Sequence, residues 1–160
     1  MIKLGDKLPD VTFTVPTPDG LKQMRTAEIF AGKTVALFGV PGAFTPTCSA
    51  RHLPSYRDKA AELQGKGVDL IACVSVNDGH VMRAWAKDQS VSEDFVMLAD
   101  GNGDFAKAVG LDADFSKFGM GLRSQRYSML VKDGVVEALY VEAPGEYKVS
   151  SAEHMLTQLG

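Results

Sequence analysis

The stretch that decides the fold runs from Thr34 to Cys48 and reads TVALFGVPGAFTPTC. Residues 34–40 are mostly apolar or β-branched and end at Pro41-Gly42, a pattern that predicts a buried β-strand. A second run, VDLIACVSV at 68–76, is apolar at nearly every position, as in a parallel strand that helices cover on both faces. The chain is therefore expected to hold two neighbouring strands of a parallel sheet.

Between these strands, apolar residues recur at steps of three and four, which predicts a helix with one buried face. The residues on that face are Leu53, Tyr56, Ala60 and Leu63. Gly65-Lys66-Gly67 follows them and is expected to end the helix. Strand, helix and strand together predict a β-α-β unit.

The alternation continues downstream of the second strand. A further helix is expected after Asn77-Asp78, with Val81, Met82 and Trp85 on its buried side. The run FVML at 95–98 predicts a short strand.

The last third of the chain predicts a hairpin and a final helix. The runs YSMLV and VVEALYV flank Lys132-Asp133-Gly134, and Asp-Gly between two such runs is a strong signal for a tight turn. The final helix is expected to start at Ser150, with Glu153 completing a capping box. The stretch 112–125, which contains Gly119 and Gly121, is expected to be a loop.

This order of elements predicts one α/β domain over residues 1–160, built as a three-layer sandwich with a central mixed β-sheet. An N-terminal extension carrying VTFTV and the turn Pro18-Asp19-Gly20 precedes it. Apolar residues make up 45% of the chain and charged residues 23%, values that exclude a disordered or fibrous protein.

The charge pattern argues against two classes of partner. The net charge is -3 and the Lys and Arg residues are scattered, so we expect neither nucleic acid nor a membrane as a partner. The first residues do not resemble a secretory signal, and the two cysteines do not resemble a secreted disulfide framework, so a cytoplasmic location is expected. An organellar protein whose targeting peptide had been removed would look the same.

Cys48 occupies a position suited to anion chemistry. Thr45 stands where a helix cap would, Pro46 would be the first helical residue, and Cys48 would then fall in the first turn. Unpaired N–H groups and the helix dipole favour a thiolate there. The site also lies at the C-terminal end of a parallel strand, where open α/β sheets bind ligands. The alternative is a cysteine that serves as a small apolar residue beneath the helix.

Four segments together resemble one family. They are PGAFTPTC at 41–48; Ser49 with His52-Leu53-Pro54; CVSVND at 73–78; and Arg123 with RYSM at 126–129. The combination resembles the peroxiredoxins, and within them the peroxiredoxin-5 and plant type II branch, over nearly the full chain.

The resemblance implies a thioredoxin-like fold and a peroxidase whose Cys48 attacks a hydroperoxide and becomes a sulfenic acid. It implies that Thr45 and Arg126 contact the peroxide and that Pro41 shields the sulfur. Gly42, Phe44 and Arg123 are expected to contribute to substrate binding. Neither a metal nor another cofactor is required by this chemistry.

The second cysteine, Cys73, lies inside an apolar strand and is interpreted as an inert core thiol, although resolution of Cys48 by Cys73 remains an alternative. The late resolving cysteine of animal peroxiredoxin-5 is missing, since residues 145–150 read GEYKVS. The resemblance therefore suggests resolution by an external thiol, either glutathione with glutaredoxin or thioredoxin. It also suggests a homodimer, with Phe44, Phe118 and Leu122 as apolar contacts.

Four other functions have weaker support. The fingerprint G-x-G-x-x-A at 101–106 lacks the acidic residue of a dinucleotide site and is better read as a turn and helix start. His52 lies four residues after Cys48, a spacing that suggests a Cys–His hydrolase as an alternative. A zinc site is not expected, because His80 and His154 lack ligand-like spacing with the cysteines. A redox-sensing module that is oxidised slowly remains the rival from another class.

Overall fold

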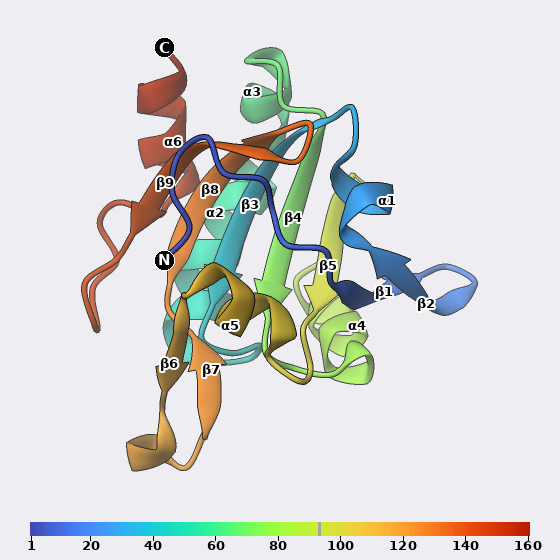
Figure 1. Ribbon diagram of the computed structural model, residues 1–160, viewed down its shortest axis with the longest axis vertical. Coiled ribbons are helices and arrows are strands. Elements are labelled where there is room, and N and C mark those ends of the chain that lie inside the picture. Colours follow the sequence, from blue (N-terminus) through green and yellow to red (C-terminus); the bar gives the residue numbers. More distant parts are fainter. Residues whose placement is uncertain (93) are drawn as a thin grey trace.

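A mixed β-sheet of seven strands forms the middle layer of the computed structural model, which describes residues 1–92 and 94–160 (Figure 1). The strands lie in the order β2-β1-β5-β4-β3-β8-β9. Their bounds are β1 Thr12–Thr17, β2 Gly20–Arg25, β3 Thr34–Val40, β4 Leu70–Ser75, β5 Phe95–Ala99, β8 Tyr127–Lys132 and β9 Val135–Val141. Strands β3, β4 and β5 are parallel and the other neighbouring pairs are antiparallel, so the predicted mixed sheet is confirmed.

Helices cover both faces of this sheet and bury a separate apolar layer on each. On one face lie the π-helix Cys48–His52, α2 Leu53–Asp58, α3 Ala60–Gly65, α4 Gly79–Asp88 and α6 Ala152–Leu159; on the other lie α1 Thr26–Phe30 and α5 Asp104–Val109. Strand β4 contributes to both layers, because Ile71 and Cys73 face the first and Ala72 and Val74 face the second. The predicted three-layer sandwich is confirmed.

The local signals for turns and caps are mostly confirmed. Asp133 and Gly134 both have positive φ, 49° and 77°, which is the geometry of a tight type I′ hairpin turn between β8 and β9. Asp78 caps α4, since its carboxylate accepts a hydrogen bond from the Val81 N–H.

The helix predicted over 53–63 is interrupted. The Leu53 N–H reaches back five residues to the Cys48 carbonyl, which makes the first segment a π-helix. Pro54 follows and has no N–H to donate to the carbonyl of Ala50, so regular α-helical bonding cannot run through this point. A second break at Lys59 separates α2 from α3.

Two other expectations are wrong in detail. The final helix is capped by Ser151, whose hydroxyl accepts from the His154 N–H, because the Ser150 hydroxyl donates instead to Glu142. The stretch expected as a loop forms a second, two-stranded sheet, with β6 Asp112–Asp114 and β7 Leu122–Ser124 joined through the 3-10 helix Ser116–Phe118. Strands of three residues carry too little alternation to be recognised in a sequence.

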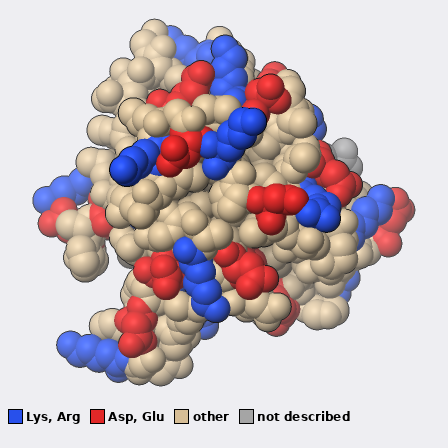
Figure 2. Space-filling view, in the orientation of Figure 1, with Lys and Arg blue, Asp and Glu red and all other residues tan. Residues whose placement is uncertain are grey.

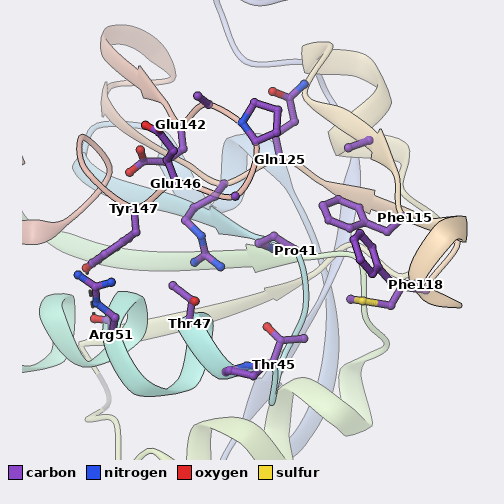
Figure 3. A pocket seen from close by; sticks show the side chains of 17 residues that line it. Pro41, Thr45, Thr47, Arg51, Phe115, Phe118, Gln125, Glu142, Glu146 and Tyr147 are labelled. Atoms are coloured by element: carbon purple, nitrogen blue, oxygen red, sulfur yellow. Dashed lines mark hydrogen bonds between the residues drawn. The ribbon is translucent and has the colours of Figure 1, made fainter.

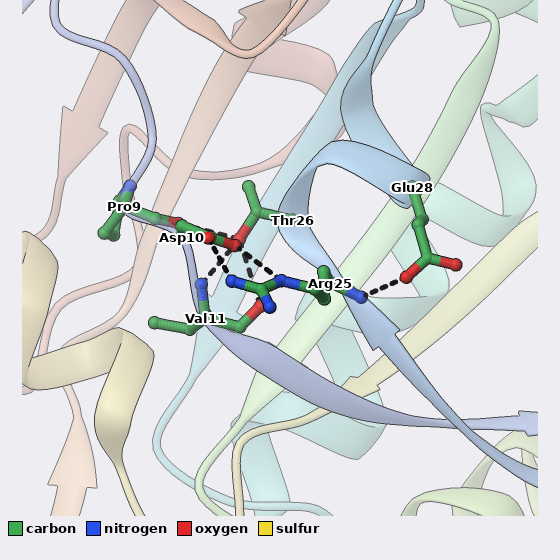
Figure 4. Close-up of polar contacts among 6 residues, drawn as sticks. All are labelled: Pro9, Asp10, Val11, Arg25, Thr26 and Glu28. Atoms are coloured by element: carbon green, nitrogen blue, oxygen red, sulfur yellow. Dashed lines mark hydrogen bonds and ion pairs between the residues drawn. The ribbon is translucent and has the colours of Figure 1, made fainter.

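The N-terminal extension is a hairpin, β1–β2, that pairs with β5 and passes directly into α1. Figure 4 shows the polar contacts that fix this junction. The Thr26 hydroxyl donates to the Pro9 carbonyl at 2.7 Å and accepts from the Val11 N–H at 3.1 Å. Arg25 forms an exposed ion pair with Asp10.

Candidate active site

Cys48 lies where β3 passes through a tight turn into the π-helix. The Thr45 carbonyl accepts the Ser49 N–H at 2.9 Å and Pro46 is the first helical residue, so the predicted helix start is confirmed. The Cys48 side chain is fully buried, in the same apolar layer as Cys73.

The turn itself is fixed by the end of β4. The side-chain oxygen of Asn77 accepts from the Ala43 N–H at 2.9 Å and from the Ser75 hydroxyl at 2.5 Å. The helix that follows is fixed by α4, since the Trp85 indole N–H donates to the Ser49 hydroxyl at 3.0 Å. The backbone on either side of Cys48 is therefore fixed by the end of β4 and by α4.

Arg126 reaches Cys48 from the opposite side of the site. Strand β8 pairs antiparallel with β3 and places Tyr127 opposite Gly39, so Arg126 lies beside the C-terminal end of β3. Its Nη2 donates to the Cys48 Sγ at 3.1 Å. Residues that are 78 positions apart in the sequence thus form a guanidinium–sulfur contact.

His52 is hydrogen-bonded to the other terminal nitrogen of the same guanidinium. Arg126 Nη1 donates to His52 Nδ1 at 2.9 Å, and His52 Nε2 donates to the Ser150 carbonyl at 2.9 Å. Burial, and then the Arg126 charge, lower the pKa of His52 to about 3, so the ring is neutral at physiological pH. Because both nitrogens are engaged, His52 offers no base to Cys48, and the Cys–His hydrolase has no support.

A cavity of about 820 Å³ lies beside this cluster and reaches it at Arg126, whereas Cys48 and His52 are buried behind its lining (Figure 3). Pro41, Thr45 and Thr47 form its centre, Phe115 and Phe118 lie on one side, and Glu142, Glu146 and Tyr147 lie on the other. Arg126 also lines it. The Thr45 hydroxyl donates to the Gly42 carbonyl at 2.7 Å, which leaves its oxygen free to accept a hydrogen bond from a ligand in the cavity.

The remaining predicted binding residues are not among those that line the cavity. A side chain at Gly42 would lie 3.1 Å from Arg123 Nη1, so glycine allows the close approach of that guanidinium. Arg123 donates through Nε to the Met120 carbonyl at 3.0 Å and through Nη1 to the Val76 carbonyl at 3.3 Å, which ties the β6–β7 hairpin to the end of β4. Phe44 is half exposed and has a φ of 65°.

Cys73 lies opposite Phe38 in the β3–β4 pairing and is fully buried. Burial raises the pKa of its thiol well above the usual range, and the nearby Cys48 adds to the rise. Both cysteines are free thiols.

The described part of the chain contains no group of three or more His, Cys, Asp or Glu side chains placed to hold a metal ion. Its helices also include none that is long and apolar enough to cross a membrane.

Sequence reasoning missed two parts of the site. The sequence placed Asn77 within the segment CVSVND, but it gave no sign that the Asn77 side chain would accept a hydrogen bond from the Ala43 N–H, because that contact depends on the fold. Glu142, which follows β9, accepts four hydrogen bonds from residues 148–150 and carried no recognisable signal.

Comparison with known proteins places this geometry in a family. The family model described as Redoxin matches residues 3–156. Peroxiredoxin-2E-2, chloroplastic, of Oryza sativa subsp. japonica is 51% identical over 99% of this chain and 72% of its own length. Peroxiredoxin-2B of Arabidopsis thaliana is 45% identical over 99% of this chain and 98% of its own. The crystal structure of reduced Prx3 from Vibrio vulnificus in complex with H2O2 matches with a TM-score of 0.95 and 52% identity over 100% of both chains. The chain therefore belongs to the peroxiredoxins, with relatives in the type II and peroxiredoxin-5 branch, and is a thiol-dependent peroxidase that acts through a cysteine.

Proposed function

We propose that Cys48 is the peroxidatic cysteine and that hydrogen peroxide and organic hydroperoxides are its substrates. The observation that carries this assignment is the 3.1 Å contact between Arg126 Nη2 and the Cys48 sulfur at the start of a helix. The guanidinium and the helix N-terminus both place positive charge where negative charge passes from the sulfur to the peroxide oxygens. The buried Cys73, whose pKa is raised, has neither advantage.

The cavity residues account for how a peroxide would be oriented. Arg126 has only donors, and the Thr45 oxygen can accept, so a peroxide O–H can donate to Thr45 while its oxygens accept from Arg126. The thiolate attacks one oxygen and the O–O bond breaks. The sulfur becomes a sulfenic acid, and the other oxygen leaves as water or an alcohol after taking a proton. Arg126 stabilises the negative charge that develops on the oxygens.

The nucleophile is tested by a steady-state peroxidase assay on the wild type and on Cys48→Ser, with hydrogen peroxide and separate reductants. We expect the variant to lose turnover with every reductant, because serine is not ionised at neutral pH. Wild-type turnover, as opposed to a single reaction per chain, would also exclude the redox-sensing alternative. Sustained activity of Cys48→Ser would refute the assignment.

We propose that an external thiol regenerates Cys48, either glutathione with glutaredoxin or thioredoxin. A first thiol displaces water from the sulfenic acid and forms a mixed disulfide, and a second thiol releases Cys48 as a disulfide forms between the two reductant sulfurs. The cavity supports this proposal, since its volume of about 820 Å³ exceeds what a hydrogen peroxide molecule fills. The same assay, run with each reductant alone, identifies the donor.

We further propose that the enzyme is a homodimer in the cytoplasm. Phe44 and Phe118, which are 52% and 68% exposed near the cavity, are the kind of large apolar side chains that a protein contact covers. Figure 2 shows acidic and basic side chains interspersed over the face in view, which favours a protein partner over nucleic acid. A reducing compartment fits a chain whose cysteines are both free thiols.

A further inference from the structure

A closed ring of hydrogen bonds surrounds Arg126. The Glu142 N–H donates to the Arg126 carbonyl at 3.0 Å, and the Arg126 guanidinium donates to His52 at 2.9 Å. His52 donates to the Ser150 carbonyl, and the Ser150 N–H and hydroxyl donate to the Glu142 carboxylate at 2.8 Å and 2.6 Å. The ring thus begins and ends at Glu142 and contains both the backbone and the side chain of Arg126.

We propose that His52, oriented by the Ser150 carbonyl that Glu142 anchors, is a positioning residue that holds the Arg126 guanidinium against the Cys48 sulfur. This inference rests on the proposed role of Cys48. It assigns a function to His52 and Glu142 that does not involve contact with the reacting atoms.

The His52 ring can hold only one orientation and one tautomer. The Ser150 carbonyl accepts, so Nε2 must carry the proton, and Nδ1 is then a bare acceptor for the arginine. Aromatic neighbours fix the plane of the ring, with Phe38 at a centroid distance of 4.7 Å and Tyr147 at 5.3 Å. The ring is fully buried, so water cannot replace either partner.

The Ser150 carbonyl is itself fixed by Glu142. A single carboxylate oxygen of Glu142 accepts from the backbone N–H groups of residues 148, 149 and 150, at 2.8, 2.9 and 2.8 Å, and from the Ser150 hydroxyl. These bonds outweigh the effect of burial and lower the pKa of Glu142, so the carboxylate is ionised at neutral pH. An ionised acceptor makes the turn at 148–150 rigid.

A neutral imidazole positions the arginine without cancelling its charge. The ion pairs of the described residues do not include Arg126. A carboxylate in place of His52 would hold the guanidinium as firmly, but it would offset the positive charge that a thiolate and a departing oxygen need. Nη1 is used for positioning and Nη2 for the sulfur, so the two functions of the guanidinium are separated.

The test compares two replacements of His52 by the rate at which hydrogen peroxide oxidises Cys48, followed by stopped-flow fluorescence. His52→Phe keeps a ring but removes the acceptor, and we expect the second-order rate constant to fall about 10- to 100-fold, the equivalent of one or two hydrogen bonds. His52→Asn keeps an acceptor near the position of Nδ1 and should recover most of that loss.

A double-mutant cycle separates positioning from packing. If His52 acts through Arg126, His52→Phe should cause almost no further loss in an Arg126→Gln background, because the group that it positions is already absent. A residue that only fills the core would give losses that multiply. Multiplicative losses, or a His52→Phe rate equal to wild type, would overturn the inference.

Tyr56→Phe is the matched control. Tyr56 is as buried as His52 and its hydroxyl donates to the same Ser150 carbonyl at 3.0 Å, but the hydrogen bonds of the described residues do not join it to Arg126. It should lower the stability without lowering the peroxide rate; an equal loss of rate in Tyr56→Phe would count against the inference. Cys48→Ser run alongside keeps the two proposals apart: its activity would refute the role of Cys48, whereas its inactivity with a normal His52→Phe rate would refute only the role of His52.

Discussion

At the residue scale, the neighbouring group is the feature that supports assigning the reactive role to Cys48 and not to Cys73. Cys48 and Cys73 are both fully buried in one apolar layer, so burial alone does not distinguish them. The Arg126 guanidinium donates to the Cys48 sulfur, whereas burial raises the pKa of Cys73. The two thiols therefore differ by a cationic donor and not by exposure, and the proposed role of Cys48 depends on that donor.

Replacing Cys73 by Ser should leave most glutathione-dependent turnover intact. The raised pKa keeps this thiol protonated, and a rigid central strand resists the movement that a disulfide with Cys48 would need. The steady-state rate with hydrogen peroxide and glutathione measures this. Complete loss of turnover in a variant that is still folded by circular dichroism would show that Cys73 resolves Cys48.

The buried His52 makes the folded state sensitive to acid. Its pKa is about 3 in the fold, surrounded by Arg126, Tyr56 and Tyr147, against an ordinary value of 6.5. Between these values only the unfolded chain takes up a proton at this position. The free energy of unfolding should therefore fall as the pH drops below 6.5 towards 3, by up to about 1.4 kcal/mol per pH unit.

Urea unfolding at a series of pH values measures this effect, with His52→Asn as the comparison. The variant lacks the titrating group, so its stability should fall less steeply over the same interval. Equal slopes for the two proteins would show that His52 does not titrate in this way.

At the scale of elements, the contact between β3 and β8 places Arg126. Gly39 in β3 faces Tyr127, and a Cβ there would lie 2.3 Å from the tyrosine ring. Glycine is needed at this point because the buried ring lies directly over the strand, and Arg126 is the residue next to that ring.

Gly39→Ala should therefore destabilise the fold by about 1–3 kcal/mol, the usual cost of overpacking a core. Chemical denaturation measures the change. Gly65→Ala is the control, because a Cβ at the end of α3 has no heavy atom within 4 Å. If the two variants were equally stable, the close approach of Tyr127 would not be a constraint on β3.

The elements that could be predicted are those with local signals. Two features could be predicted because each depends on residues that are adjacent in the sequence. They are the continuous apolar runs of β3 and β4 and the Asp133-Gly134 turn. The π-helix and the short β6–β7 hairpin were missed, since one depends on where hydrogen bonds close around Pro54 and the other on three-residue strands. Cys48 was predicted from its place between a strand and a helix start, and Arg126 from the resemblance. The His52 contact joins residues 74 positions apart and could not be read from spacing.

At the scale of the whole molecule, the exposed Phe44 and Phe118 predict association. Light scattering after size exclusion should give the mass of two chains of 17.2 kDa for the wild type. Phe44→Ser with Phe118→Ser should shift the mass towards one chain, because the variant removes two apolar contacts. Leu4→Ser, also at an exposed apolar position, is the control and should remain a dimer. A wild type with the mass of one chain would contradict the prediction.

The two apolar layers on opposite faces of the sheet have a consequence for an enzyme that repeatedly modifies its own core. Both cysteine sulfurs lie in one layer, while the packed rings of Phe13 and Phe105 lie in the other. Under the proposed role of Cys48, we expect an oxygen atom or a bound reductant added there to change the packing of the first layer rather than the second, because the backbone of the sheet separates the two. The layer built around Phe13 and Phe105 should then hold the strands in register while the layer around Cys48 accommodates the modified sulfur.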